Sequence, residues 1–224
     1  MRSVDDRTTK SRIRDAAITC IAEHGVADTT ARKVAAEAGV SAGLVIHHFG
    51  SMEGLREACD HFVATTIRSY KEDAIAGGPN IDVLAALRNA DVGPLAAYLA
   101  EVLNEDSPTV ARLVDELVAD AEAYIEQGVE AGMVLPSSDP RGRAVVLTIW
   151  SLGALVLHRH LKRMLDVDPT SPGFGKDPSF AAYAGPLYEV YTDGFLAEPF
   201  ATNLRRSIAE AQDLAQAPEN EGTS

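Results

Sequence analysis

Apolar residues recur at steps of three and four along most of the chain, which is the spacing of one face of an α-helix. Near the N-terminus, Ile13 and Ile21 belong to such a face, which predicts a first helix over about 7–24. Two shorter apolar patterns separated by a tight turn then predict a helix, a turn and a second helix within 30–48. The first part of the chain is therefore expected to be a small unit of three helices.

Polar residues and glycine mark the boundaries of these helices. Thr30 and Ser41 stand where an N-cap hydroxyl is expected, and Ser51 precedes a long apolar pattern that continues to about 76. Gly39 lies between the two short helices and allows the left-handed backbone of a tight turn. This arrangement is typical of a helix-turn-helix followed by a long helix.

The rest of the chain carries further helical patterns, separated by segments rich in Pro and Gly. No stretch shows the convincing alternation of a β-strand, so the predicted fold class is all-α. The polar tail over 218–224 is expected to be disordered. The later helices are predicted near 81–88, 92–104, 108–132, 140–165, 179–197 and 201–216.

Charge is distributed unevenly along the chain. The 224 residues carry a net charge of −13, which argues against a protein that coats nucleic acid. The first 56 residues hold eight Lys and Arg against seven Asp and Glu, so they carry +1 and the remainder carries −14. A relatively basic head on an acidic body is compatible with DNA binding by the head alone.

The sequence predicts no membrane segment, no metal site and no cofactor. No run of about 18 uncharged apolar residues occurs, and the charged N-terminus lacks the apolar core of a signal peptide. Cys20 and Cys59 lie far apart in helical patterns, which predicts buried free thiols and a cytoplasmic location. His47 and His48 are adjacent, and neighbouring helical residues point about 100° apart, so this pair is not expected to hold a metal.

The stretch TTARKVAAEAGVSAGLVIHHFGSMEGL, over 29–55, closely resembles the signature of the TetR family of bacterial transcriptional regulators. The segment VIHHFGS also resembles the corresponding segment of an actinobacterial subgroup, whose members often control efflux-pump genes. The matching positions are Gly25, Thr30, Val34, Ala35, the EAGVS of 37–41, Gly43, His48, Phe49, Ser51, Glu53 and Leu55.

The resemblance implies a domain organisation and a set of partners. Residues 1–50 would form the helix-turn-helix DNA-binding domain, 51–217 the helical effector-binding and dimerisation domain, and 218–224 a disordered tail. The protein would be a homodimer that binds a near-palindromic double-stranded DNA operator. A small-molecule effector would release it by favouring the conformation that does not bind DNA.

The resemblance also implies which residues face DNA. Small residues at the start of the second short helix let it enter the major groove deeply, and an arginine at position 32 would favour guanine. Arg32 is otherwise a solvated side chain, and Arg7, Lys10 and Arg12 are either phosphate anchors or ordinary surface charges. The implied DNA-binding residues are Thr30, Arg32, Lys33, Ser41, Ala42, Gly43, Leu44, Ile46, His47 and Met52.

Two of these positions depart from the family pattern. The family usually has Tyr at the position of Ile46 and Lys at the position of Met52, and both usual residues contact phosphate. Neither residue present here can make a charged or hydroxyl contact. Either DNA affinity is modest or other residues compensate, and Ile46 is alternatively placed to touch a thymine methyl group.

The resemblance places the effector pocket inside the body, and the dimer contact in the helices predicted over 140–165 and 179–197. Their apolar residues exceed what one buried stripe needs, which favours a partner. The pocket is expected to suit an apolar effector, and the acidic charge of the body is compatible with a cationic one. The candidate pocket residues, each of which is also an ordinary core position, are Phe62, Tyr98, Leu99, Leu103, Leu113, Leu117, Tyr124 and Trp150.

Two other classes of function were weighed against a regulator. An enzyme would use His158 or His160 as a base, but the chain has no nucleophile motif and no phosphate loop. The HRH of 158–160, followed by Lys162 and Arg163, is instead typical of a cationic helix end. The second alternative is a partner-binding or ligand-binding helical protein with weakened DNA affinity, which Ile46 and Met52 motivate.

Overall fold

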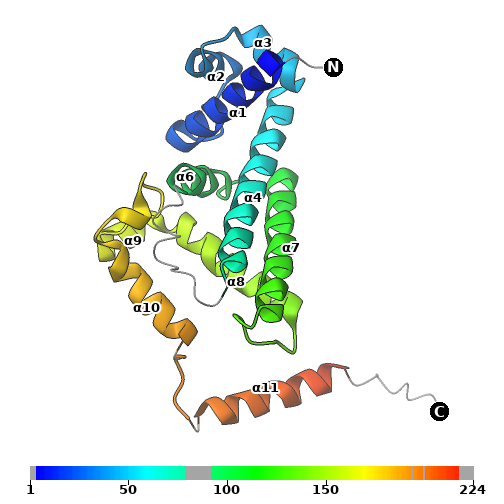
Figure 1. Cartoon of the computed structure of the whole chain (residues 1–224), viewed down its shortest axis with the longest axis vertical. Helices are drawn as coiled ribbons and strands as arrows, with labels where there is room; N and C mark the ends of the chain where they lie inside the picture. The colour runs from blue at the N-terminus through cyan, green and yellow to red at the C-terminus, as the bar shows by residue number, and fades with distance from the viewer. Residues whose placement is uncertain (1–3, 79–91, 193, 199, 217–224) are drawn as a thin grey trace, which may run out of the picture. The chain divides into compact units, whose positions relative to one another are not determined.

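The computed structural model describes residues 4–78, 92–192, 194–198 and 200–216 (Figure 1). Within these ranges the regular structure is helical and no strand occurs, so the predicted all-α class is confirmed. The chain divides into two compact units, over 1–180 and 181–224, which are described separately below.

The first three helices form the reading head, defined here as residues 4–50. The head contains α1 (Val4–His24), α2 (Ala31–Ala38) and α3 (Ala42–Phe49). Ile13, Val34 and Val45, one from each helix, are completely buried. Each helix therefore turns one apolar face inward, as the spacing of its apolar residues predicts.

Side-chain caps fix both ends of the turn in the helix-turn-helix. The Thr30 hydroxyl accepts a hydrogen bond from the backbone N–H of Lys33 at 3.3 Å, and the Ser41 hydroxyl accepts one from Leu44 at 3.2 Å. Gly39 ends α2 with a φ of 66°, the left-handed conformation that glycine adopts without strain. The predicted caps and the predicted turn are confirmed.

The long helix α4 (Met52–Ala76) begins directly after the head. Ser51 caps it by accepting a hydrogen bond from the backbone N–H of Gly54 at 3.0 Å. A Cβ atom on Gly54 would overlap the backbone carbonyl oxygen of Phe49, the last residue of α3. The close approach of these two backbone segments sets how α3 enters α4, and only glycine permits it.

The remaining helices of the first unit form the body around α4. In Figure 1, α4 and α7 run side by side, and the chain contacts confirm this neighbourhood. The helix α6 packs against α1 and α8, and α8 packs against α7. The bounds are α6 (Gly93–Val102), α7 (Pro108–Glu130), α8 (Pro140–Val156), α9 (His158–Leu165) and the 3-10 turn η1 (Phe174–Lys176).

The head and the body share one hydrophobic core. Ile13 and Val34 of the head belong to the same cluster of buried side chains as Leu55 of α4 and Leu113 of α7. Tyr98 of α6 is the largest of the completely buried side chains. A change in the packing of α4 or α6 is therefore transmitted to the head through packed side chains rather than through a flexible linker.

One predicted helix, over 140–165, is wrong as a single element. The helix α8 ends at Val156 and α9 begins at His158, with a bend of 70° between them. Leu157 leaves helical geometry, with φ of −96° and ψ of 16°, although no proline or glycine marks that position. The bend places the HRH segment at the start of α9, so His158 opens a helix instead of closing one.

The second unit contains α10 (Phe180–Thr192) and α11 (Phe200–Gln216). The helix predicted over 179–197 thus ends earlier than expected, and the one predicted over 201–216 is confirmed. The helix predicted over 81–88 and the tail lie outside the described residues. Among the described residues no single helix has the length and composition of a membrane span, which only the bent pair α8–α9 reaches when taken together.

Candidate nucleic-acid interface

The outward face of α3 is open to solvent along its length. Val45 is completely buried and anchors the helix, whereas Gly43, Ile46 and His47 are exposed, with Ile46 40% exposed. Ala42 and Leu44 are half-buried at its first turn. A short helix held by one buried residue can present its opposite face to another molecule without losing its own packing.

The start of α3 is narrow. The side chains at the start of α3 are small, at Ser41, Ala42 and Gly43. If Gly43 carried a Cβ atom, its nearest neighbour would be the Ser41 hydroxyl oxygen, at 3.9 Å. The fold itself does not need glycine at 43, unlike at 54. A narrow helix N-terminus with free backbone N–H groups fits a DNA groove and its phosphates.

The helix α2 contributes two exposed cations beside this face. Arg32 and Lys33 follow the capping residue Thr30, and neither makes an ion pair with a residue in the described part of the chain. Both are therefore available to an anionic partner. Both lie in the first turn of α2, where the resemblance implies that Arg32 contacts DNA and that Lys33 is either a phosphate anchor or a surface charge; these contacts stay a prediction.

The basic side chains near the start of α1 make different contacts. A guanidinium nitrogen of Arg12 donates to the carbonyl oxygen of Ala38 at 2.6 Å, and so caps the C-terminal end of α2. The ammonium group of Lys10 lies 5.2 Å from the centre of the Phe49 ring. Arg12 thus supports the helix-turn-helix, while the side chain of Arg7 lies outside the described residues.

The two adjacent histidines occupy different environments. The ring centres of His47 and His48 lie 5.6 Å apart at an angle of 70°, and His48 lies edge-on to Phe49 at 6.5 Å. His47 is exposed and His48 is half-buried. Within the described residues, no group of three His, Cys, Asp or Glu side chains converges in a way that could hold a metal ion.

The two departures from the family pattern also differ from each other. Ile46 is 40% exposed, so its apolar side chain lies on the outward face of α3. Met52 is half-buried and packs against the shared hydrophobic core. Met52 therefore contributes to packing at the start of α4, where the family usually places a cation.

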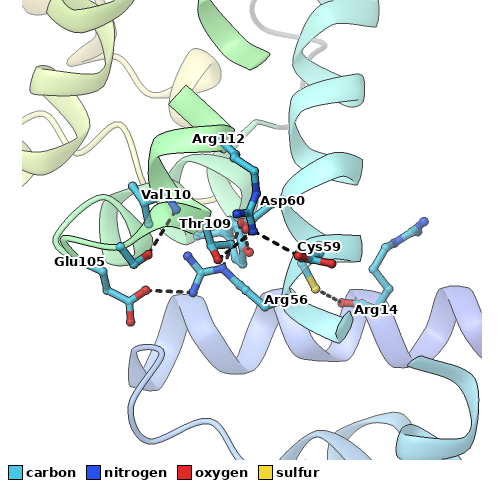
Figure 2. A network of polar contacts seen from close by, with 11 residues as sticks. Arg14, Arg56, Cys59, Asp60, Glu105, Thr109, Val110 and Arg112 are labelled. Atoms are coloured by element: carbon cyan, nitrogen blue, oxygen red, sulfur yellow. Dashed lines mark hydrogen bonds and ion pairs between the residues drawn. The ribbon is translucent and has the colours of Figure 1, made fainter. Parts of the chain in front are cut away.

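A buried polar network joins α4 to α6 and to the segment before α7 (Figure 2). Arg56 Nε donates to Asp60 Oδ1 at 3.0 Å, and Arg56 Nη1 donates to Glu105 Oε2 at 3.3 Å. The Tyr98 hydroxyl donates to the same Asp60 oxygen at 2.5 Å. Burial raises the pKa of Tyr98, so it stays a donor. We call these four residues the junction network.

Of these four residues, only Tyr98 is named by the resemblance, as a candidate pocket residue. In the sequence Arg56 is one of the positive charges of the first 56 residues, yet it is 9% exposed and Asp60 is 5% exposed. The one available signal was their spacing of four residues, which puts an Arg and an Asp on the same face of a helix. The partner on α6 follows from tertiary packing and has no signal in the local sequence.

Both cysteines are buried and free, as predicted. Cys59 lies between the junction residues and α1, and its Sγ is 3.7 Å from the carbonyl oxygen of Arg14 (Figure 2). Burial raises the pKa of Cys59 to about 12, which removes its nucleophilic thiolate at neutral pH. It is a packing residue at the contact between α1 and α4.

The eight candidate pocket residues fall into three environments. Phe62, Leu103 and Tyr124 are half-buried, and Trp150 is 60% exposed on α8. None of the eight lines the cavity described below between the head and the body, and their role in a pocket stays a prediction. The four buried members are Tyr98, Leu99, Leu113 and Leu117.

The helix α8 exposes an apolar face. Val146 is 46% exposed, Ile149 is 50% exposed and Trp150 is 60% exposed, while Ala144, Thr148 and Leu152 are buried on the other side. A helix that is apolar on both sides buries one of them in its own chain and leaves the other for a partner. In the second unit, Tyr191 is 51% exposed and Phe195 is 84% exposed.

Two family models match the chain. The model described as "Bacterial regulatory proteins, tetR family" matches residues 13–59, which cover most of the head and the start of α4. The model described as "Tetracyclin repressor-like, C-terminal domain" matches residues 91–197, which cover the body and α10.

Similar proteins agree with the models over nearly the whole chain. The chain is 39% identical over 214 residues to the HTH-type transcriptional regulatory protein RaaS of Mycobacterium tuberculosis, covering 95% of this chain and 97% of that protein. A solved structure on the control of antibiotic production by bacterial hormones is 20% identical, with a TM-score of 0.60 over 88% of this chain and 100% of its own. The SmeT–triclosan complex is 21% identical, with a TM-score of 0.51 over 78% and 91%. At these identities the two structures support the fold alone.

Proposed function

The chain belongs to the TetR family of bacterial transcriptional regulators, and from this premise we propose that it is a homodimeric repressor released from its operator by a small molecule. Members of this family bind DNA operators and small-molecule ligands. Family members and the relative described above are transcriptional regulators rather than enzymes. Residues of this chain are proposed below to contact DNA, the second copy of the chain and the effector.

The observation that carries the proposal is the open outward face of α3. Ser41, Ala42 and Gly43 at its start have small side chains, and the exposed Arg32 lies in the first turn of the preceding helix α2. This combination supports insertion of α3 into the major groove, with Arg32 and His47 reaching bases or phosphates at its edges. The remaining predicted DNA-binding residues surround this face, except that Met52 is turned partly into the core.

A second copy of the chain is the partner that the exposed face of α8 favours. Two copies related by a two-fold axis would present two reading heads to one duplex. Heads that occupy successive major grooves must stand roughly 34–36 Å apart, and the two-fold symmetry of the dimer makes the operator near-palindromic. The exposed apolar residues of α8 support this assembly because they would be covered in a dimer.

The effector is proposed to be small and largely apolar, and to bind inside the body beside α4. The eight residues named above are its candidate contacts, and a cytoplasmic location gives access to effector and DNA alike. Binding shifts the population toward a dimer whose heads no longer match the operator, provided that the effector prefers that state. The resemblance of the VIHHFGS segment to an efflux-linked subgroup supports efflux or transport genes as targets.

The environment of His158 argues against a base in a helical enzyme. Its Nδ1 atom lies 3.4 Å from an Asp168 oxygen and 3.3 Å from the hydroxyl of Thr170. That hydroxyl donates to Asp168 at 2.6 Å, so it is not oriented by the histidine for attack. The group holds the segment after α9 against its first turn.

Salt-dependent DNA binding tests the proposal directly. Fluorescence anisotropy would compare the duplex upstream of the chain's own gene with a random duplex, at two salt concentrations. We expect tight binding to the upstream duplex that weakens with salt because phosphate contacts release counterions. Equal and weak binding to both duplexes would favour the alternative, a helical ligand-binding protein whose Ile46 and Met52 have cost it DNA affinity.

A further inference from the structure

We propose that a crevice between the reading head and the body is a binding site for a small organic cation with an apolar portion. The crevice has a volume of about 260 Å³ and opens to solvent between α1, the start of α4 and the segment before α7. It is a different place from the pocket proposed inside the body, because none of those eight candidate residues lines it.

The wall on the head side is mostly apolar. Ala17 and Ile21 of α1 and Val26 of the following turn contribute to it, together with the Thr29 side chain. The Thr29 hydroxyl already donates to the carbonyl oxygen of Gly25 at 2.8 Å, so it adds little polarity. This wall favours a hydrocarbon or aromatic portion of a ligand.

The opposite wall carries two carboxylates. Glu53 lies exposed in the first turn of α4, and Glu105 lies in the segment between α6 and α7 with its side chain 38% exposed. The one basic residue that lines the crevice is Arg56, whose charge is already balanced by Asp60. The crevice is therefore net negative, and its polar edge favours a cation.

Glu105 belongs both to the crevice and to the junction network, so a cation bound to it would affect that network. Arg56 Nη1 holds Glu105 at 3.3 Å, but the neighbouring Nη2 is buried and has no hydrogen-bond partner among the described residues. Glu105 thus engages only one edge of the guanidinium. A cation on the solvent side of Glu105 would hold the carboxylate between two positive groups, so binding and the junction network depend on each other.

Because the crevice lies between the head and the body, a ligand bound in it would affect DNA binding by the head. One wall belongs to the head and the other to the body, so ligand affinity must change if the two move relative to each other. By linkage, the ligand then changes DNA affinity by the same factor. This coupling rests on the proposed function, whereas the binding of the cation does not.

Calorimetry on the full chain without DNA tests the site. The probe is 2-phenylethylammonium, and its uncharged counterpart is 2-phenylethanol. We expect one amine per chain and much weaker binding of the alcohol. Glu53→Gln and Glu105→Gln should each weaken amine binding at least about threefold, the scale of a partly exposed ion pair.

Glu57→Gln is the matched control, because Glu57 is exposed one turn after Glu53 on the same helix and does not line the crevice. It should leave amine binding unchanged. Absence of amine binding, equal binding of the alcohol, or an equal loss in Glu57→Gln would each overturn the site. The last result would mean that the amine is attracted only to an acidic surface.

A second titration separates the coupling from the proposed function. The anisotropy measurement on DNA is repeated with the amine near its wild-type dissociation constant, and we expect a change in DNA affinity in wild type that is smaller in Glu53→Gln. An unchanged affinity in a chain that binds DNA overturns the coupling. A chain that binds no DNA contradicts the proposed function instead, and the calorimetric result then decides the cation site alone.

Discussion

The reading head and the helix α8 both carry apolar helical faces, but the two regions differ in how much of that apolar surface is buried within one chain. In the head, Ile13, Val34 and Val45 are completely buried within one chain, and hydroxyl caps close both short helices. In α8, Ile149 and Trp150 remain at least half exposed. The head buries its apolar faces within one chain, whereas α8 leaves an apolar face exposed, which we propose a second copy of the chain covers.

This difference separates two kinds of effect that substitutions can have. A change inside the head or at its junction with the body alters folding of the single chain. A change on the open face of α8 or α3 alters binding and leaves the fold in place. The predictions below use that separation, beginning with the largest effect.

Asp60→Ala should destabilise the chain most strongly. It leaves the buried Arg56 without its balancing charge and Tyr98 without its acceptor, and breaking a buried ion pair costs about 3–5 kcal/mol. Urea unfolding at equal protein concentration measures the loss. Tyr98→Phe, which removes one hydrogen bond, should cost about 1 kcal/mol. A loss in Asp60→Ala no larger than in Tyr98→Phe would contradict the role given to the junction network.

Trp150→Ala should weaken the dimer while leaving each chain folded. A tryptophan at the centre of an interface contributes about 2 kcal/mol or more, equivalent to a dissociation constant about thirtyfold higher. Sedimentation equilibrium measures that constant. Leu135→Ala is the control, because Leu135 is 83% exposed and lies before α8. Equal behaviour of the two variants would show that α8 is not the dimer contact.

Gly43→Ala should separate DNA binding from stability. A methyl group at 43 would make only an ordinary van der Waals contact, with the Ser41 hydroxyl oxygen at 3.9 Å, and should add up to about 1 kcal/mol of helix stability. The same methyl group thickens the end of α3 that enters the groove, so DNA affinity should fall about tenfold, or 1.4 kcal/mol. In Gly54→Ala, both stability and DNA affinity should fall, because the new Cβ overlaps the Phe49 carbonyl. Wild-type DNA affinity in Gly43→Ala would place the DNA elsewhere.

Met52→Lys should have the smallest effect. A lysine there can extend its ammonium group to solvent and restore one phosphate contact per head, which steepens the slope of log affinity against log salt by about 0.9 per head, or about 1.8 for the dimer. Anisotropy over a salt series measures the slope. Met164→Lys makes the same substitution on α9, where Met164 is 60% exposed, and should leave the slope unchanged. Equal slopes for both variants and wild type would mean that position 52 does not face a phosphate.

The sequence predicts the head well because its signals are local. Thr30, Gly39 and Ser41 specify the turn through their own hydroxyls and backbone freedom, without help from distant residues. The bend at Leu157 has no such signal, because neither proline nor glycine stands there and the basic HRH segment that follows is compatible with a continuous helix. The junction network escaped prediction for a related reason: Tyr98 meets Asp60 across 38 residues of sequence.

The candidate site divides in the same way. The residues on the exposed face of α3 could be named in advance because the segment over 29–55 resembles the signature of the TetR family. The half-buried position of Met52 and the capping role of Arg12 depend on neighbouring helices, and local spacing does not reveal them. The crevice behind the head is formed by three segments that only the folded chain brings together.

The central claim is that two complete heads are held on one duplex by the open faces of α8. Light scattering on the chromatographed complex with the upstream duplex tests this most directly, because it gives the mass of protein bound. The account predicts two chains on a single operator in wild type, and loss of that complex in Trp150→Ala at concentrations where the variant chain remains folded. A complex with one chain per duplex, or an unchanged two-chain complex in Trp150→Ala, would contradict it.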